Sequence, residues 1–456
     1  MRISKHIVAF GAVVAMLVIS NVAVAQDTSR SSVFGLSECI QFALENNLDI
    51  KNSMLDADQA EMKVKETISK GLPQVNGKWD LMFNPALQPQ FIPNEGPFSD
   101  PTNPSETLPL VFGTDWTSNM SATLNQLIFD GSYFVGLKAA KTYKELYAKG
   151  VSQTEIEVIA NVKKAFYGVL IANERLIQLD RNLGQLDKLM NDTKVMYDNG
   201  FVEKVDMQRI EVNINNLKVE RQKIVSLGVI SESLLKYQMG MPLKEKISLN
   251  GSLDELINSL KAEEATVNYN DRVEYQNLVV QQTLGELNLK NEKISILPSL
   301  GVFATGGLTY GALTFSNAVS FGDYKGYAML GGSLSVPIWS SGIRKHRIDQ
   351  AKVDLDKVLN SKLQLQNSID LQVIQSKLGY EDNLATLETH EKNVALAEEV
   401  YRVSKVKYEQ GVGSNFEVVE SENLVKDTQS NYYGAVYDAL VSKVDLDKAK
   451  GVLTAE

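Results

Sequence analysis

The segment Lys194-Val195-Met196-Tyr197-Asp198-Asn199-Gly200 returns later in the chain as Lys405-Val406-Lys407-Tyr408-Glu409-Gln410-Gly411. Subtracting the residue numbers gives an offset of 211, and the same offset separates Asp130-Gly131 from Ser341-Gly342. Leu72-Pro73 also returns, as Leu297-Pro298, at a longer offset of 225. The chain is therefore read as an internal duplication whose first half carries a longer loop, and this duplication sets the architecture.

The composition excludes several classes of function. The chain has 456 residues and a net charge of −10, which makes it a poor partner for nucleic acid. Cys39 is the single cysteine and the three histidines are scattered, so neither a disulfide nor a zinc site is expected. The phosphate-binding loop, the H-E-x-x-H pair and the G-x-S-x-G elbow are missing from the sequence. We expect a protein that is not an enzyme and has no catalytic residues, metal or cofactor.

The first 25 residues have the pattern of a secretory signal peptide. Arg2 and Lys5 form a basic start, an apolar or small run follows from residue 7 to residue 19, and Ala23-Val24-Ala25 is a small-residue cleavage site. The run is short for a membrane-spanning helix, which needs about 20 residues, although an uncleaved anchor is the alternative. We expect a mature chain of residues 26–456 that has left the cytoplasm.

Proline placement predicts long helices. All eleven prolines lie outside residues 110–241 and 338–456, so these stretches are free to be helical. We expect long helices at about 132–199 and 343–409, each followed after a glycine by a return helix, at about 203–239 and 415–450. Shorter helices are expected at 37–70 and 271–296. An apolar seam of coiled-coil type follows the first long helix: Leu176, Leu179, Leu183, Leu186 and Met190.

Between the short and the long helix of each half, residues alternate with a period of two. The four stretches are residues 75–83, 116–124, 300–310 and 328–338, and this pattern is typical of strands in a membrane β-barrel. Aromatic residues in or beside them fit an interface with lipid head groups: Trp79, Trp116, Tyr310, Tyr327 and Trp339. Two soluble hairpins with a half-buried face would also alternate, and this alternative stays open.

A membrane sheet of four strands has a consequence for assembly. The smallest spanning barrels have about eight strands, and an open edge in lipid leaves unpaired backbone groups that cost several kcal/mol each. If the strands lie in a membrane, the chain must therefore oligomerise, and three copies of a four-stranded sheet would give a twelve-stranded barrel. The helices would continue from this barrel as a tube.

With its duplication, its order of helix, hairpin and helix, and its Tyr-x-x-Gly tips, the chain resembles the TolC-type outer-membrane efflux proteins, the outer membrane factor family. The resemblance covers nearly all of the mature chain as one domain: a first repeat at about 36–240, an equatorial segment at about 241–270 and a second repeat at about 271–451, with barrel hairpins at about 73–130 and 298–341. It implies a homotrimeric channel-tunnel, mostly α with a membrane β part. It also implies an outer-membrane location, a helical part in the periplasm, and a periplasmic adaptor and an inner-membrane pump as partners.

The resemblance also suggests two sites at the helix tips. Asp206, Glu417 and Glu420 fall where the family has its periplasmic gate, and rings of carboxylates there would select for cations. Acidic residues are also ordinary in a first helical turn, and Ser414 to Glu417 read as a capping box. Some relatives place a latching arginine where this chain has Gly413. Adaptor contact is expected at the two turns: Gly200, Phe201, Val202, Gly411, Val412 and Gly413. The alternative is that these are simply tight turns that require glycine.

A basic cluster, Arg344-Lys345-His346-Arg347, follows the last strand. Cations are unfavourable at a helix N-terminus, so we expect either contact with anionic lipid head groups or a solvated cluster. The leading hypothesis for function is a passive trimeric exit duct of a tripartite efflux or secretion system. The alternative is a periplasmic coiled-coil scaffold or adaptor with soluble β-hairpins. The sequence does not specify the transported substrate.

Overall fold

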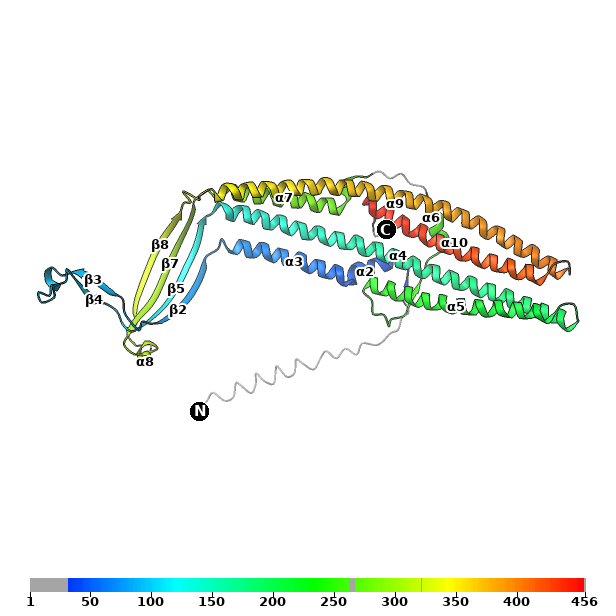
Figure 1. The fold of residues 1–456 in the computed structure, drawn as a ribbon, viewed down its shortest axis with the longest axis horizontal. Helices are drawn as coiled ribbons and strands as arrows, with labels where there is room; N and C mark the ends of the chain where they lie inside the picture. The colour runs from blue at the N-terminus through cyan, green and yellow to red at the C-terminus, as the bar shows by residue number, and fades with distance from the viewer. Residues whose placement is uncertain (1–31, 262–266, 321, 455–456) are drawn as a thin grey trace, which may run out of the picture.

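The computed structural model describes residues 32–261, 267–320 and 322–454. The expected signal peptide, residues 1–25, lies outside these ranges. The described chain is elongated, with a β-sheet at one end of a set of long, nearly parallel helices (Figure 1). The sheet and the tips of the longest helices lie at opposite ends of the molecule.

The long helices lie where the proline-free stretches predict them. Helix α4 runs over Gly131–Asp198 and returns as α5, Lys204–Met239. Helix α9 runs over Ile343–Glu409 and returns as α10, Asn415–Lys450. At about 1.5 Å per residue, the longer member of each pair extends roughly 100 Å. The two hairpins therefore have closely matching helix lengths, as an internal duplication predicts.

The short helices differ in one respect from the sequence expectation. The second, α7, is a single helix over Val273–Ile294. The first is broken into α2, Leu36–Asn46, and α3, Leu48–Ser69. At the break, the Asn47 side chain accepts hydrogen bonds from the backbone N–H groups of Asp49 and Ile50, and its Nδ2 donates to the Gln238 carbonyl at 2.8 Å. Asparagine can cap a helix as well as sit inside one, so the pattern alone did not reveal this break.

The central sheet has four antiparallel strands in the order β2-β5-β7-β8. They are β2 (Gln74–Phe83), β5 (Trp116–Phe129), β7 (Ser299–Ala312) and β8 (Lys325–Ser335). Strands β2, β5 and β7 cover the stretches in which period-two alternation predicts them, whereas β8 is shifted: it begins before residue 328 and ends at Ser335, short of the predicted end at residue 338. The sheet joins the two halves of the duplication, because β5 of the first half pairs with β7 of the second.

Several small elements were not predicted. The proline-rich loop of the first half contains a hairpin of β3 (Pro89–Pro93) and β4 (Thr107–Val111), which extends beyond the sheet (Figure 1). Strand β1 (Ser32–Phe34) pairs in parallel with β6 (Ile247–Leu249). Short helices complete the described chain: η1 (Gly96–Phe98), α6 (Leu253–Ser259), η2 (Tyr269–Asp271) and α8 (Phe315–Ala318). Such short segments give too little periodicity to be recognised.

Among the described residues, the two larger of three apolar clusters hold most of the helices together. The larger lies around the middle of the molecule, where Phe166 of α4, Leu235 of α5 and Val436 of α10 are buried with Cys39 of α2. Burial raises the pKa of the Cys39 thiol to about 12, as expected for a packing residue. The second cluster lies in the distal half and contains the predicted seam, with Leu179 and Leu186 buried against Ile210 and Leu217. In the part of the chain that the structure describes, no helix has the length and apolarity needed to cross a membrane.

Candidate functional site

The two faces of the sheet differ in chemistry. The strand register places Val75, Leu124, Ala304 and Leu330 together on one face, and the next pairs on this face are similarly apolar or small. The opposite face carries polar groups, among them Lys78 with Ser121, and Asn119 with Thr309. A hydrogen bond joins Asn119 and Thr309. One apolar and one polar face is the pattern of a barrel wall between lipid and an aqueous lumen.

The sheet is open at both edges, and the edges are compatible with each other. Strands β2 and β8 each have one neighbour among the described residues, and both are largely exposed. Because all three pairings in the sheet are antiparallel, β2 and β8 run in opposite directions. The β8 edge of one copy could therefore continue the antiparallel ladder onto the β2 edge of another copy. The two strands have similar lengths, 10 and 11 residues.

Aromatic side chains gather at both ends of this sheet. At the end away from the helices, Trp116 lies between Phe83 and Phe315, with ring centroids 4.6 Å and 5.1 Å away. At the helical end, Phe134 lies 6.3 Å from Phe129 and 5.5 Å from Tyr133. Two aromatic belts that border an apolar band are the signature of a membrane barrel. The helical-end cluster was not predicted, although Phe129, Tyr133 and Phe134 follow one another closely in the sequence.

The five aromatics singled out from the sequence occupy different positions. Trp116 and Tyr310 lie on the apolar face near the outer end, while Trp79 lies on that face near mid-strand and donates to Ser118 Oγ at 2.9 Å. Trp339 follows β8 and is 86% exposed. Tyr327 departs from the expectation. It pairs with Gly307 on the polar face, and a Cβ on Gly307 would lie only 2.6 Å from the Tyr327 ring. This ring covers a glycine of the neighbouring strand, and the register turns it away from the apolar face.

The two helix tips at the far end have the same turn geometry. Gly200 and Gly411 have positive φ angles of 80° and 71°, which glycine adopts without steric cost. In both turns the N–H of the following residue, Phe201 or Val412, donates to a carbonyl five positions earlier, at 2.9 Å and 3.0 Å. This pattern is a Schellman helix ending. It leaves Phe201 and Val412 each 79% exposed at the tips.

The three predicted gate carboxylates are in different environments. Glu417 and Glu420 are exposed on the first turns of α10. Asp206 is largely covered: its carboxylate accepts a hydrogen bond from the Glu203 N–H at 3.2 Å and lies 3.5 Å from Arg209. Asp206 therefore has a basic partner in its own helix, which sequence reasoning missed. Ser414 Oγ caps α10 by accepting from the Glu417 N–H at 3.2 Å, which is the predicted first half of a capping box.

The tips of the two hairpins are joined by polar contacts. Asn415 Nδ2 of α10 donates to the Asp206 carbonyl of α5 at 2.9 Å, and Arg209 lies 6.0 Å from the centre of the Phe416 ring. At Gly413, a Cβ would lie 2.8 Å from Lys407 Cβ and 3.0 Å from the Tyr408 N atom. The close approach of the turn favours glycine at this position.

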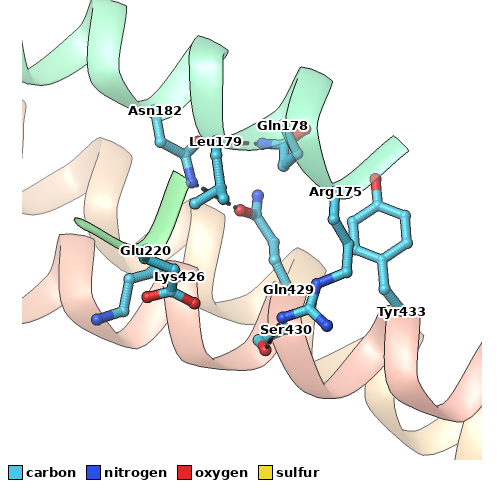
Figure 2. A pocket seen from close by; sticks show the side chains of 9 residues that line it. All are labelled: Arg175, Gln178, Leu179, Asn182, Glu220, Lys426, Gln429, Ser430 and Tyr433. Carbon is cyan, nitrogen blue, oxygen red and sulfur yellow. Dashed lines mark hydrogen bonds between the residues drawn. The ribbon is translucent and has the colours of Figure 1, made fainter. Parts of the chain in front are cut away.

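Further polar contacts cross between the hairpins behind the tips. Asn182 of α4 points toward Gln429 of α10 and donates to it at 3.0 Å, and Arg175 donates to Ser430 at the same distance (Figure 2). These residues line a cavity of about 20 Å³, which is room for about one water molecule. Nearer the tips, the hydroxyl oxygens of Thr193 and Tyr408 form a hydrogen bond at 3.3 Å. A hydrophobic seam is thus interrupted by polar layers where the two hairpins meet.

The most unusual group in this region is Glu422, which sequence reasoning missed. Its side chain is buried between α5 and α10 and accepts a hydrogen bond from Asn213 Nδ2 at 3.0 Å, while its Oε1 atom has no partner. Desolvation raises the pKa of this carboxyl to about 7. The sequence does contain a signal, because Val418, Glu422, Val425 and Gln429 follow the spacing of a core seam.

The sheet is amphipathic, its open edges are compatible with each other, and it is joined to two long helical hairpins. This is the arrangement expected of outer-membrane channels whose barrel continues into a helical tunnel. The comparisons with known proteins agree with this class. Residues 292–452 match the family described as outer membrane efflux protein. The outer membrane protein TolC of Vibrio cholerae serotype O1 is 21% identical over 460 residues, which cover 95% of each chain. The TolC protein of Salmonella enteritidis is 19% identical over 442 residues, covering 94% of this chain and 84% of that protein.

Solved structures agree on the fold. The open state of the Neisseria gonorrhoeae MtrE outer membrane channel has a TM-score of 0.70 at 16% identity, covering 91% of this chain and 88% of that one. The Campylobacter jejuni CmeC outer membrane channel has a TM-score of 0.68 at 16% identity, covering 91% of this chain and 85% of that one. Residues 292–452 thus match the outer membrane efflux protein family, and nearly the whole chain is similar to TolC proteins. These similarities indicate a location in the outer membrane with the helices in the periplasm.

Proposed function

We propose that three copies of the chain form one continuous exit duct for a tripartite efflux system. The single observation that carries this proposal is the sheet with opposite, open edges. Its four strands are too few to close a barrel. Strands β8 and β2 of successive copies can pair antiparallel, and three repetitions of this contact close a ring of twelve strands. The apolar face then meets lipid, and the polar face lines the lumen.

The helical hairpins extend this ring as a periplasmic tube. Two long hairpins per copy place six tips at the end of a trimer. Each tip presents an exposed apolar side chain, Phe201 or Val412, on a rigid glycine turn. We propose that these turns, residues Gly200, Phe201 and Val202 and residues Gly411, Val412 and Gly413, contact a periplasmic adaptor, which connects the duct to an inner-membrane pump. The pump supplies the energy, and the duct itself is passive.

The entrance of the tube is proposed to be a cation-selective constriction. Glu417 and Glu420 are exposed and three residues apart, so they lie on one side of α10. In a trimer they supply six carboxylates around one axis. Asp206 contributes less to the negative potential of this entrance, because Arg209 lies 3.5 Å from its carboxylate. Rings of carboxylates of this kind attract cations and repel anions.

Conductance in planar bilayers tests the duct and its entrance together. Wild-type protein should form cation-selective channels that multivalent cations block from the periplasmic side. In the double variant Glu417→Gln and Glu420→Gln, this block should weaken by on the order of tenfold, because a unit charge pair at 4 Å is worth about 1 kcal/mol even in water. The matched control is Asp427→Asn with Asp438→Asn, two exposed acids further along α10.

The outcomes separate the two claims. Anion selectivity of the wild-type channel, or equal weakening of the block in the control, would refute the carboxylate entrance and leave the duct intact. A purified protein that forms no channels and does not enter bilayers would refute the duct and favour a periplasmic scaffold.

A further inference from the structure

A concave surface lies where the last strand of the sheet meets helix α9. Its volume is about 490 Å³, and its lining combines apolar side chains with basic ones. We call it the junction surface and define it by Ile338, Trp339, Arg344, Lys345 and Lys352. It lies at the helical end of the sheet, at the level of the aromatic cluster formed by Phe129, Tyr133 and Phe134.

The charge of the junction surface is opposite to that of the whole chain. Arg344, Lys345 and Lys352 face one carboxylate, that of Asp349, which pairs with Lys352 at 3.0 Å. His346 and Arg347 continue the basic sequence, whereas the complete chain has a net charge of −10. A local excess of cations on an acidic protein indicates an anionic partner at this place.

The equivalent position in the first half has a different electrostatic arrangement. Asp130 caps α4 by accepting from the N–H groups of Ser132 and Tyr133, at 2.7 Å and 3.2 Å. Helix α9 begins after Gly342 with no side-chain cap, and basic residues occupy its first turns. Cations are unfavourable at this end of a helix, so the second half lacks the anion that the first half supplies itself. The basic cluster and its apolar rim, rather than the helix start, define the surface.

The apolar rim continues the apolar face of the sheet. Ile338 is 89% exposed and Trp339 is 86% exposed. Leu330 and Leu334 of β8 are also exposed, and the register places both on the apolar face. An apolar strand surface thus passes into an exposed tryptophan and then into a group of cations. This order matches the acyl chains, the interface and the head groups of one leaflet.

We propose that the junction surface binds the phosphate groups of anionic phospholipids in the periplasmic leaflet of the outer membrane. Arg344, Lys345 and Lys352 contact the phosphate oxygens, and Ile338 and Trp339 enter the boundary between head groups and acyl chains. The proposal rests on the proposed function, because it requires the sheet to lie in the membrane. It adds a lipid preference and gives the basic residues of α9 a role.

The test compares the full-length protein in nanodiscs of phosphatidylcholine with and without phosphatidylglycerol. Retention of phosphatidylglycerol is measured by native mass spectrometry, and the melting temperature is measured in both lipids. Phosphatidylglycerol should raise the wild-type melting temperature. The triple variant Arg344→Gln, Lys345→Gln and Lys352→Gln should bind phosphatidylglycerol with an affinity lower by at least about tenfold. It should also lose most of the increase in melting temperature that phosphatidylglycerol gives the wild type.

The matched control changes the same number of charges at the opposite end of the helices. Lys188→Gln, Lys194→Gln and Lys218→Gln alters three exposed lysines of the distal half and should behave as wild type. Inorganic phosphate added to phosphatidylcholine nanodiscs should have no effect. An equal response of the triple variant and the wild type to phosphatidylglycerol would overturn the proposal, as would a wild-type response to free phosphate. Failure to insert into either lipid would instead contradict the proposed function.

Discussion

Single residues explain where the hairpin interface departs from a simple hydrophobic seam. Glu422 occupies a core position of α10, where it is 3% exposed. Asn213 donates a hydrogen bond to one oxygen of the Glu422 carboxyl. The nearby Tyr401 hydroxyl has no hydrogen-bond partner, and desolvation together with the charge of Glu422 raises its pKa. Lys426 lowers and Asp427 raises the pKa of this carboxyl, but desolvation is the larger cause and raises it to about 7. This carboxyl therefore stays protonated in the folded protein at pH values where it ionises in the unfolded chain.

The protonation of Glu422 predicts a pH-dependent stability. In the folded protein the pKa of Glu422 lies above the ordinary value of 4.5. Its contribution to the free energy of unfolding is therefore fully present below pH 4.5 and is lost as the pH rises to about 7. The variant Glu422→Gln cannot ionise, so above pH 7 it should be more stable than wild type by up to roughly 3 kcal/mol, at 1.36 kcal/mol per pH unit. Denaturant unfolding in detergent at pH 4.5 and at pH 8 measures this difference.

The control for this prediction is Glu391→Gln, which changes an exposed glutamate on α9. It should leave the stability nearly unchanged at both pH values. A loss of stability in Glu422→Gln at pH 8 would show that the ionised carboxylate, rather than the protonated acid, is the form that holds the hairpins together.

The residue scale also shows the limits of the sequence. The repeated tyrosine and glycine turns predicted where the tips lie, because a positive φ angle constrains the residue type. The sequence did not predict the basic partner of Asp206 or the burial of Glu422. Charged residues are frequent on the long helices of this chain, and only the packing of α5 against α10 decides which of them is covered.

At the scale of elements, proline and glycine placement together with period-two alternation predicted the four long and returning helices and the four strands of the sheet. These signals extend over ten or more residues, so they outweigh local propensity. The break at Asn47 and the β3–β4 hairpin were missed because each depends on a few residues in tertiary context. At the break, Gly240 has a φ of 70°, and a Cβ there would lie 2.5 Å from the Asn46 carbonyl oxygen.

The break between α2 and α3 makes its own prediction. Asn47→Ala removes a helix cap together with the contact to the Gln238 carbonyl, and it should lower the free energy of unfolding by about 1–3 kcal/mol. Chemical denaturation of the purified protein measures this loss. Asn52→Ala, an exposed position inside α3, serves as the control and should be close to neutral. A neutral Asn47→Ala would mean that the two helices are held in place by apolar packing alone.

At the scale of the whole molecule, one physical requirement links sheet, helices and function. A four-stranded sheet with an apolar face leaves backbone groups unpaired at β2 and β8, and these groups cannot be satisfied by lipid. Copies of the same chain can satisfy them, because the edges run in opposite directions. The sequence predicted this requirement from the number of strands, whereas the direction of the two edges became clear only from the sheet order.

Cryo-electron microscopy of the full-length protein in nanodiscs tests this requirement most directly. The account predicts a particle with threefold symmetry in which β8 of each copy pairs antiparallel with β2 of the next and closes a barrel of twelve strands. A single chain in the bilayer with both edges unpaired, or a closed ring with another number of copies, would contradict it.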